Sequence, residues 1–299
     1  MRLTNVKALL ITTALFIALL IASCAKPSQE TPSTPQQPGL SGSIKVIGSN
    51  TVTPISSVWA ENFMKANPKV SIAVSGPGSG VGIAALIDGT TDICQASRAM
   101  KSSEIDQAKA KGHNPYEIKV AYDGLAIVVN PANKVNELTM EQLSDIYAGK
   151  VSNWKDVGGA NAPIVVISRD SNSGTHVFFK EHIVQLKDKK AEYGQNALFL
   201  PSTEAGITET AGNVNAIFYA GLGYISKDVK ILGIKKDASS AVVTPRIATV
   251  HDNSYPVARP LFFYTDGVPQ GVIKAFVDYG LSQEGQAAVE KMGFVPLPR

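Results

Sequence analysis

The stretch "VISRDSNSGTHVFF", residues 166–179, decides how the rest of this chain is interpreted. Its apolar beginning is typical of a buried strand and its aromatic end suits a helix, with Arg169, small polar residues and Gly174 between them. The first turn of a helix carries unpaired N–H groups and a partial positive charge. The pattern therefore predicts a strand, a turn and a helix, with an oxyanion bound where the helix begins.

Two further stretches repeat this arrangement. In "VIGSNTVTPISS", residues 46–57, a strand precedes small polar residues and a helix that opens with a proline. In "VSGPGSGVGIAAL", residues 74–86, a glycine-rich turn separates a strand from a helix. Glycine lets the backbone approach a ligand closely, and serine or threonine adds a hydroxyl donor. One such turn could be an ordinary capped helix, but three of them predict a converging anion site.

Short β-branched runs alternate with amphipathic helical runs along the chain, which is typical of the α/β class. We expect strands near residues 43–48, 69–76, 120–130, 163–168 and 215–226, and helices near 54–67, 80–89, 137–150, 176–184, 271–280 and 284–293. The clearest helix is the one at 137–150. There Thr139 and Gln142 form a capping-box pattern, and Gly149 marks the end of the helix.

The first forty residues are predicted to lie outside the fold. Positive charges precede a short apolar run, which is typical of a secretory signal, so we assign a signal peptide to residues 1–23. The sequence "IASC" at residues 21–24 resembles the lipobox of bacterial lipoproteins, in which the cysteine, here Cys24, carries lipid. An ordinary signal peptide with an incidental cysteine, or an uncleaved anchor, is the alternative. Residues 24–42 are rich in Pro, Ser, Thr and Gln, which predicts a disordered tether. The protein is therefore expected to be extracytoplasmic and held to the cell membrane by lipid alone.

Composition and motifs disfavour several classes of function. A net charge of +3 over 299 residues gives no reason to expect a nucleic-acid partner. The chain contains neither a P-loop nor a G-x-S-x-G nucleophile elbow, and its four histidines have no metal-site spacing. We therefore expect no metal, no cofactor and no enzymatic activity. If Cys24 is lipidated, Cys94 has no disulfide partner and should be a small buried apolar residue.

Seven segments resemble one known family in order and spacing. They are "GSNTVTPI", "GPGSGVGIAALIDGTTDICQASR", "DGLAIVVNPANKVNELTMEQLSDIYAGKVSNWKDVGG", "RDSNSGTHVFF", "GLGYIS", "YPVARPLFFYT" and "GFVPL". Over almost all of residues 43–297 the chain resembles the phosphate-binding protein of the phosphate ABC transporter, the PstS type, in its short-chain branch.

This resemblance implies a two-lobed periplasmic-binding-protein fold of the type II kind, in which each lobe is a mixed sheet flanked by helices. Residues 43–121 and 255–299 would form the first lobe, and residues 122–254 the second. Two chain crossovers, near 122–123 and 251–255, would act as the hinge. The implied function is capture of inorganic phosphate between the lobes by a monomer, without chemistry, and delivery to the transmembrane subunits of an ABC permease.

The resemblance also implies a set of phosphate-binding residues. They are Ser49, Asn50, Thr51, Ser79, Ser97, Arg98, Arg169, Ser173, Gly174 and Thr175. Asn50 departs from the usual GST pattern of the first turn. Arg98 and Ser171 stand where the longer branch of the family has aspartates, so we expect extra positive charge that favours the phosphate dianion. Rejection of sulfate would then depend on neutral or main-chain acceptors.

Other interpretations of these residues stay open at this point. The chain could bind sulfate, molybdate or tungstate, or it could be a phosphate-sensing or adhesive lipoprotein that takes no part in transport. Arg98 could form an ion pair with Asp92 or Glu104, and Arg169 one with Asp170. The serines and threonines of the three turns could be helix caps, which is compatible with anion binding through the same geometry.

Overall fold

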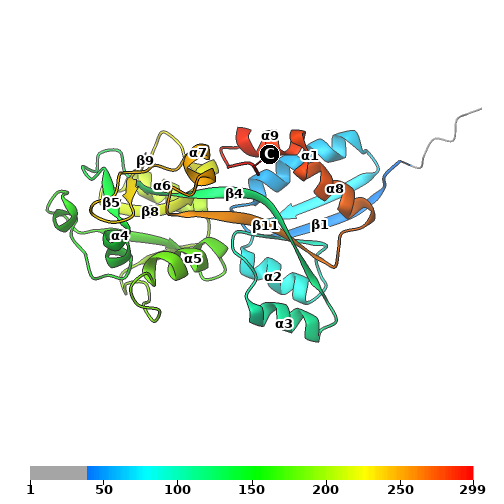
Figure 1. The fold of residues 1–299 in the computed structure, drawn as a ribbon, viewed down its shortest axis with the longest axis horizontal. Helices are drawn as coiled ribbons and strands as arrows, with labels where there is room; N and C mark the ends of the chain where they lie inside the picture. Colours follow the sequence, from blue (N-terminus) through cyan, green and yellow to red (C-terminus); the bar gives the residue numbers. More distant parts are fainter. Residues whose placement is uncertain (1–38, 299) are drawn as a thin grey trace, which may run out of the picture. The chain divides into compact units, whose positions relative to one another are not determined.

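The computed structural model describes residues 39–298. The predicted signal peptide at 1–23, the predicted lipidation site Cys24 and most of the predicted tether lie outside these residues. Within the described part, no helix is long and apolar enough to cross a membrane. The α/β class is confirmed, because strands and helices alternate along the described chain (Figure 1).

Strands of both directions form a nine-stranded sheet in the order β2-β1-β3-β11-β4-β8-β6-β7, with β9 paired to β4 beside this path. Their bounds are β1 Gly42–Gly48, β2 Val70–Ser75, β3 Ile93–Ala96, β4 Pro115–Val129, β6 Val165–Arg169, β7 Leu198–Leu200, β8 Ala216–Gly221, β9 Lys230–Ile231 and β11 Ala258–Asp266. A second, two-stranded sheet pairs β5 (Glu137–Thr139) with β10 (Gly233–Lys235). The expected strand over 215–226 ends at Gly221, because the next three residues form a 3-10 turn.

Helices follow most strands. Their bounds are α1 Thr53–Ala66, α2 Ser79–Ile87, α3 Ser102–Ala110, α4 Met140–Tyr147, α5 Gly174–Phe179, α6 Thr203–Gly212, α7 Ile247–His251, α8 Gly271–Leu281 and α9 Gln283–Lys291. The expected helix over 176–184 is divided into α5 and a π-helical turn at Lys180–Val184. All three strand-turn-helix junctions predicted from the sequence are present, as β1-α1, β2-α2 and β6-α5.

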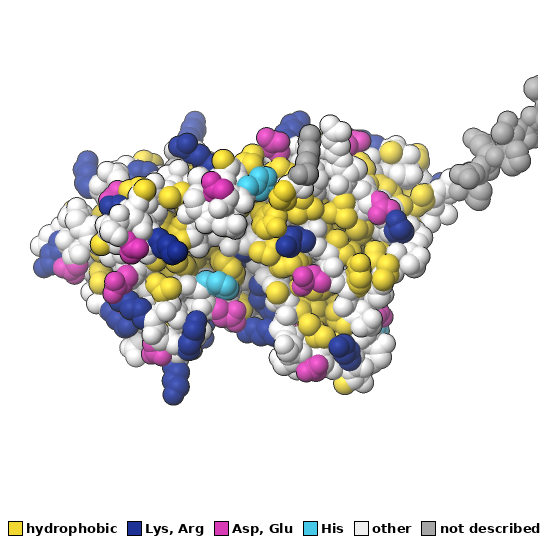
Figure 2. Space-filling view, in the orientation of Figure 1, with side chains coloured by type: hydrophobic (Ala, Val, Ile, Leu, Met, Phe, Trp, Pro, Cys, Tyr) yellow, Lys and Arg dark blue, Asp and Glu magenta, His cyan; other side chains and the backbone are white. Residues whose placement is uncertain are grey.

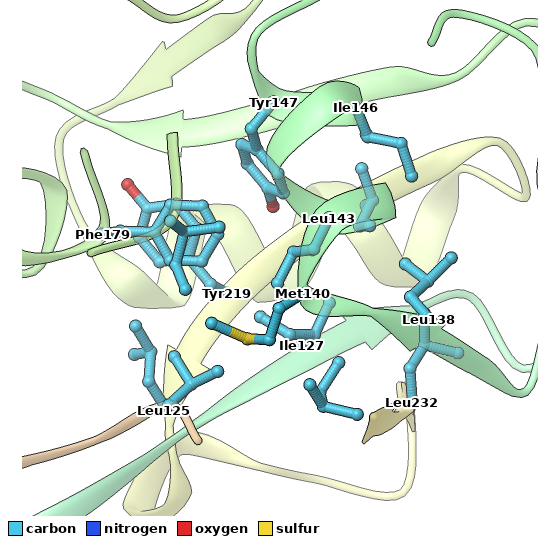
Figure 3. Packing of buried hydrophobic residues seen from close by; sticks show 14 of the residues in the cluster. Leu125, Ile127, Leu138, Met140, Leu143, Ile146, Tyr147, Phe179, Tyr219 and Leu232 are labelled. Carbon is cyan, nitrogen blue, oxygen red and sulfur yellow. The ribbon is translucent and has the colours of Figure 1, made fainter. Parts of the chain in front are cut away.

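Apolar side chains form separate cores along the long strands β4 and β11. One core surrounds Trp59, which is fully buried and donates its indole N–H to the carbonyl of Gly285 at 2.8 Å. Another gathers side chains from β4, β8 and the helices α4 and α5 (Figure 3). In this second core the rings of Phe179 and Tyr219 stack with centroids 4.0 Å apart. Cys94 is buried and free, as the sequence predicts.

The long strands β4 and β11 pair with each other and connect the regions of these cores (Figure 1). β11 pairs β3 on its other edge, whereas β4 pairs β8. The chain therefore passes twice between the part that holds α1, α2 and α3 and the part that holds α4, α5 and α6. These two strands bring turns that are far apart in sequence to the same place.

The capping box of α4 is confirmed and gives a first prediction. The Thr139 hydroxyl accepts from the Gln142 N–H at 3.1 Å, and the Gln142 side chain accepts from the Thr139 N–H at 2.9 Å. Replacing Thr139 with alanine should lower the free energy of unfolding by about 1 kcal/mol, because one N–H of the first turn loses its acceptor. Urea denaturation measures the loss, with Ser103→Ala, an exposed change within α3, as the control. Equal midpoints for the two variants would contradict the prediction.

Candidate functional site

Four hydroxyl groups from different parts of the chain meet at one buried place. The Thr51 and Thr175 hydroxyl oxygens lie 2.9 Å apart, and those of Ser79 and Ser97 lie 3.3 Å apart. The Ser97 hydroxyl is also 3.5 Å from that of Thr175, and the Ser79 hydroxyl accepts from the Ser97 N–H at 3.1 Å. None of the four side chains is more than 3% exposed. We call these residues the hydroxyl cluster.

The predicted turns position this cluster. Thr51 lies in the turn before α1, Ser79 is the first residue of α2, and Thr175 is the second residue of α5, while Ser97 follows β3. The main-chain N–H groups of Thr51, Ser79, Gly174 and Thr175 find no acceptor within residues 39–298. Because an unpaired buried N–H costs about 1–3 kcal/mol, several of them beside one cluster favour an anionic partner.

Gly174 lies directly against the cluster. A Cβ built on it would stand 2.2 Å from the Ser79 hydroxyl oxygen, 2.7 Å from the Ser79 Cβ and 2.8 Å from the Ser97 hydroxyl oxygen. Real side chains do not approach this closely, so only glycine lets α5 begin here. The predicted role of glycine, close approach of backbone to the site, fits this position.

Ser49 and Ser173, also predicted as site residues, use their hydroxyls within their own turns. The Ser49 hydroxyl accepts from the Val52 N–H at 3.3 Å. The Ser173 hydroxyl accepts from the His176 N–H, also at 3.3 Å, as the N-cap of α5. Neither hydroxyl is hydrogen-bonded to the cluster within the described residues. Both therefore shape the turns beside the cluster.

Asn50 and Arg169 contact each other. The Asn50 side-chain oxygen accepts from Arg169 Nη1 and from the Thr203 N–H, each at 3.1 Å. Arg169 also donates to the Thr203 hydroxyl at 2.7 Å and to the carbonyls of Leu200 and Pro201. It is 2% exposed, and burial lowers its pKa. In the described part its hydrogen-bond partners are neutral oxygens, and Asp170 is not among them.

Arg98 is directed away from the cluster. Its guanidinium binds Glu104 with two hydrogen bonds, of 2.8 and 2.7 Å, and donates to the carbonyl of Ala99. Burial alone would raise the pKa of Glu104, but the hydrogen bonds from Arg98 and from the Lys101 N–H hold that pKa below its ordinary value. This is one of the ion pairs that the sequence left open. The expected extra positive charge at Arg98 is therefore compensated by a carboxylate.

Sequence reasoning missed Arg259 and Asp123. Arg259 on β11 is 2% exposed; it donates to the Thr175 hydroxyl and to the Ser97 carbonyl, each at 2.9 Å. Asp123 on β4, directly opposite in the strand pairing, accepts from Arg259 at 3.0 and 3.3 Å. The signal was available, because each is the one charged residue in an otherwise apolar stretch, "VARPLFF" and "VAYDGLAIVV".

The Tyr219 hydroxyl contacts the end of β6, just before the turn to α5. Its hydroxyl accepts from the Arg169 N–H at 3.2 Å and lies 2.6 Å from the Ser168 hydroxyl. His176 Nδ1 donates to the Arg169 carbonyl at 2.8 Å, and the same nitrogen lies 3.3 Å from the Ser168 hydroxyl oxygen. Burial lowers the pKa of His176, so the ring is favoured in its neutral form at neutral pH. The turn is thus held by neutral groups.

Charged side chains of both signs lie on the surface. Figure 2 shows acidic and basic side chains interspersed over the face in view. Among residues 39–298, no group of three or more His, Cys, Asp or Glu side chains could hold a metal ion. Cavities of about 380 and 750 Å³ border Gly149 and helix α9, and none of the cluster residues lines them. The local arrangement at the cluster is therefore suited to a small anion.

Comparison with known proteins agrees with this geometry. The PBP superfamily domain matches residues 33–284. The phosphate-binding protein PstS of Staphylococcus epidermidis is 36% identical over 272 residues, which cover 87% of this chain and 80% of that protein.

Two solved structures are also similar. One is a candidate phosphate ABC transporter substrate-binding protein from Clostridium perfringens with bound phosphate; it is 33% identical, with a TM-score of 0.77, covering 86% of this chain and 100% of that one. The other is an ABC-type phosphate transport receptor from Vibrio cholerae, 31% identical with a TM-score of 0.70, covering 85% and 100%. The chain therefore belongs to the PBP superfamily and, within it, to the PstS family of phosphate-binding proteins.

Proposed function

We propose that this protein captures inorganic phosphate outside the cytoplasmic membrane and delivers it to an ABC permease, without breaking a bond. One observation carries the proposal: four buried hydroxyls and the unpaired N–H groups of three helix beginnings converge at one place. A charge-assisted hydrogen bond contributes about 1.5–3 kcal/mol before association costs are subtracted. Half a dozen such bonds are enough for the net 8 kcal/mol or so of a micromolar site.

The hydroxyl cluster suits phosphate better than sulfate. Phosphate carries a proton at neutral pH, and a hydroxyl can accept that proton as well as donate to the other oxygens. No carboxylate within residues 39–298 is hydrogen-bonded to the cluster, since Asp123 is occupied by Arg259 and by the Leu222 N–H. Discrimination would therefore depend on hydroxyl oxygens, the neutral acceptors that the sequence led us to expect.

Closure of two lobes around phosphate would make capture reversible. The proposed lobes, 43–121 with 255–299 and 122–254, each hold part of the site. The contacts Thr51–Thr175 and Asn50–Arg169 each join a residue of the proposed first lobe to one of the proposed second lobe. Donors on both sides favour the closed state most when ligand is present, because a ligand shifts an equilibrium by its differential affinity. Attachment by lipid at Cys24 would keep a monomer close to the permease.

Calorimetry with phosphate and sulfate tests the proposal. The purified full chain should bind phosphate with a micromolar or lower Kd. Sulfate should bind at least about tenfold more weakly, because it offers no proton to the hydroxyl oxygens, and tenfold corresponds to about 1.4 kcal/mol. Molybdate serves as a third tetrahedral oxyanion. Absence of phosphate binding, or tighter binding of sulfate or molybdate, would contradict the assignment, and turnover of a phosphomonoester would contradict the absence of chemistry.

A further inference from the structure

Three arginines stand near the site, and they differ in what they contact. Arg98 is occupied by Glu104, and Arg169 by Asn50 and the residues around the start of α6. Only Arg259, among the arginines of the described chain, is hydrogen-bonded to a hydroxyl of the cluster. Its Nη2 donates to the Thr175 hydroxyl, and its Nη1 donates to the main chain of Ser97.

The position of Arg259 is fixed from three sides. Asp123 binds its Nε and Nη2 from the neighbouring strand, the Ser97 carbonyl binds Nη1, and the Phe178 ring lies 5.3 Å below the guanidinium carbon. Asp123 is itself held by the Leu222 N–H at 3.1 Å. These bonds leave one Nη1 hydrogen without an acceptor in the described part, on a side chain that is 2% exposed.

A buried arginine–aspartate pair needs a reason other than stability. Removing two charges from water costs several kcal/mol per ion, and well-packed apolar residues often serve the fold equally well. This pair is buried, with Asp123 in the middle of β4 and Arg259 at the start of β11, where most neighbouring residues are apolar. Through Arg259 the pair contacts the hydroxyl cluster at Thr175, which is where a positive charge would act on an anion.

We propose that Arg259 acts beside Arg169 as a cationic donor to the oxyanion at the hydroxyl cluster, and that Asp123 is the positioning residue that aims it. The inference rests on the proposed function and deepens it, because it gives a binding role to an arginine that lies within the family-like segment "YPVARPLFFYT" but was not among the predicted phosphate-binding residues. The guanidinium provides both charge and a fixed fork of donors. Arg98, by contrast, serves the fold through Glu104.

Two double variants, each of which removes one arginine and one carboxylate, test this inference at constant net charge. R259Q/D123N should raise the phosphate Kd of the full chain at least about 100-fold, whereas the control R98Q/E104Q should stay within about threefold of the unaltered protein. Thermal unfolding without phosphate checks that both variants are folded. Wild-type affinity in R259Q/D123N, or an equal loss in the two double variants, would overturn the inference.

Single lysine variants separate charge from packing and cover the case in which a double variant does not fold. R259K keeps the charge and loses the fork, so its phosphate Kd should rise about tenfold, an effect intermediate between the unaltered protein and R259Q/D123N. R98K should leave the Kd unchanged. Unchanged binding in R259K would overturn the role of the fork of donors, and a loss as large as that of the double variant would overturn the role of charge. Phosphate binding by the unaltered chain separates the inference from the proposed function. If the unaltered chain does not bind phosphate, both the proposed function and the inference are wrong. If the unaltered chain binds phosphate and R259Q/D123N binds it equally well, only the inference is wrong.

Discussion

Replacing Gly174 with alanine should weaken phosphate binding by at least about 100-fold, or about 2.7 kcal/mol. The added methyl group would stand 2.2 Å from the Ser79 hydroxyl oxygen and 2.7 Å from the Ser79 Cβ, so α5 or α2 must move to admit it. Either movement disturbs the hydroxyl cluster, in which the Ser97 hydroxyl lies 3.3 Å from that of Ser79 and 3.5 Å from that of Thr175. Calorimetry of the folded variant measures the loss.

The control is the same substitution where there is space. Gly212 is the last residue of α6, and a Cβ on it meets nothing within 4 Å. Gly212→Ala should leave phosphate affinity unchanged and should be neutral or slightly stabilising, because alanine restricts the unfolded chain. If Gly174→Ala binds phosphate as tightly as Gly212→Ala does, the hydroxyl cluster is not where phosphate binds.

Local signals in the sequence were enough to predict how the site is built. Strand-turn-helix junctions follow from apolar runs interrupted by glycine and small polar residues, and such local patterns do not depend on the rest of the fold. The cap at Thr139 and the buried Cys94 were predicted in the same way, and the structure confirms both. Ser173 was predicted beside the site, and its hydroxyl is the cap of α5. A cap and an anion-binding turn use the same residue types, so the sequence could not separate these roles.

The sequence could not predict which side chains become partners when they are far apart along the chain. Arg98 could pair with either of two acidic residues or face the site, and the choice depends on where the start of α3 places Glu104. Arg259 and Asp123 are 136 residues apart and meet only because β11 pairs antiparallel to β4 in one particular register. Asn50 was expected to donate to an anion, but its side-chain oxygen accepts from Arg169, 119 residues away. Each of these outcomes follows from tertiary structure.

Replacing Arg169 with methionine should have opposite effects on binding and on stability. The phosphate Kd should rise about 100-fold, because a buried guanidinium that binds no carboxylate leaves its charge free to act on the nearby cluster. Without phosphate, the variant should be at least as stable as the unaltered protein. A buried charge without an ionic partner is costly, and methionine removes it while filling similar space.

Thermal unfolding with and without phosphate measures both effects in one experiment. A ligand that binds only the folded state stabilises it by about 2.7 kcal/mol at a concentration of 100 Kd, so the unaltered protein should gain far more from phosphate than the variant. Arg246→Met removes the same charge from an exposed position and should keep the full gain. The contrary result is an Arg169 variant that unfolds at a lower temperature without phosphate, yet gains as much thermal stability from phosphate as the unaltered protein. Arg169 would then only join the turn after β1 to the start of α6. The cluster and Arg259 would then hold the anion alone.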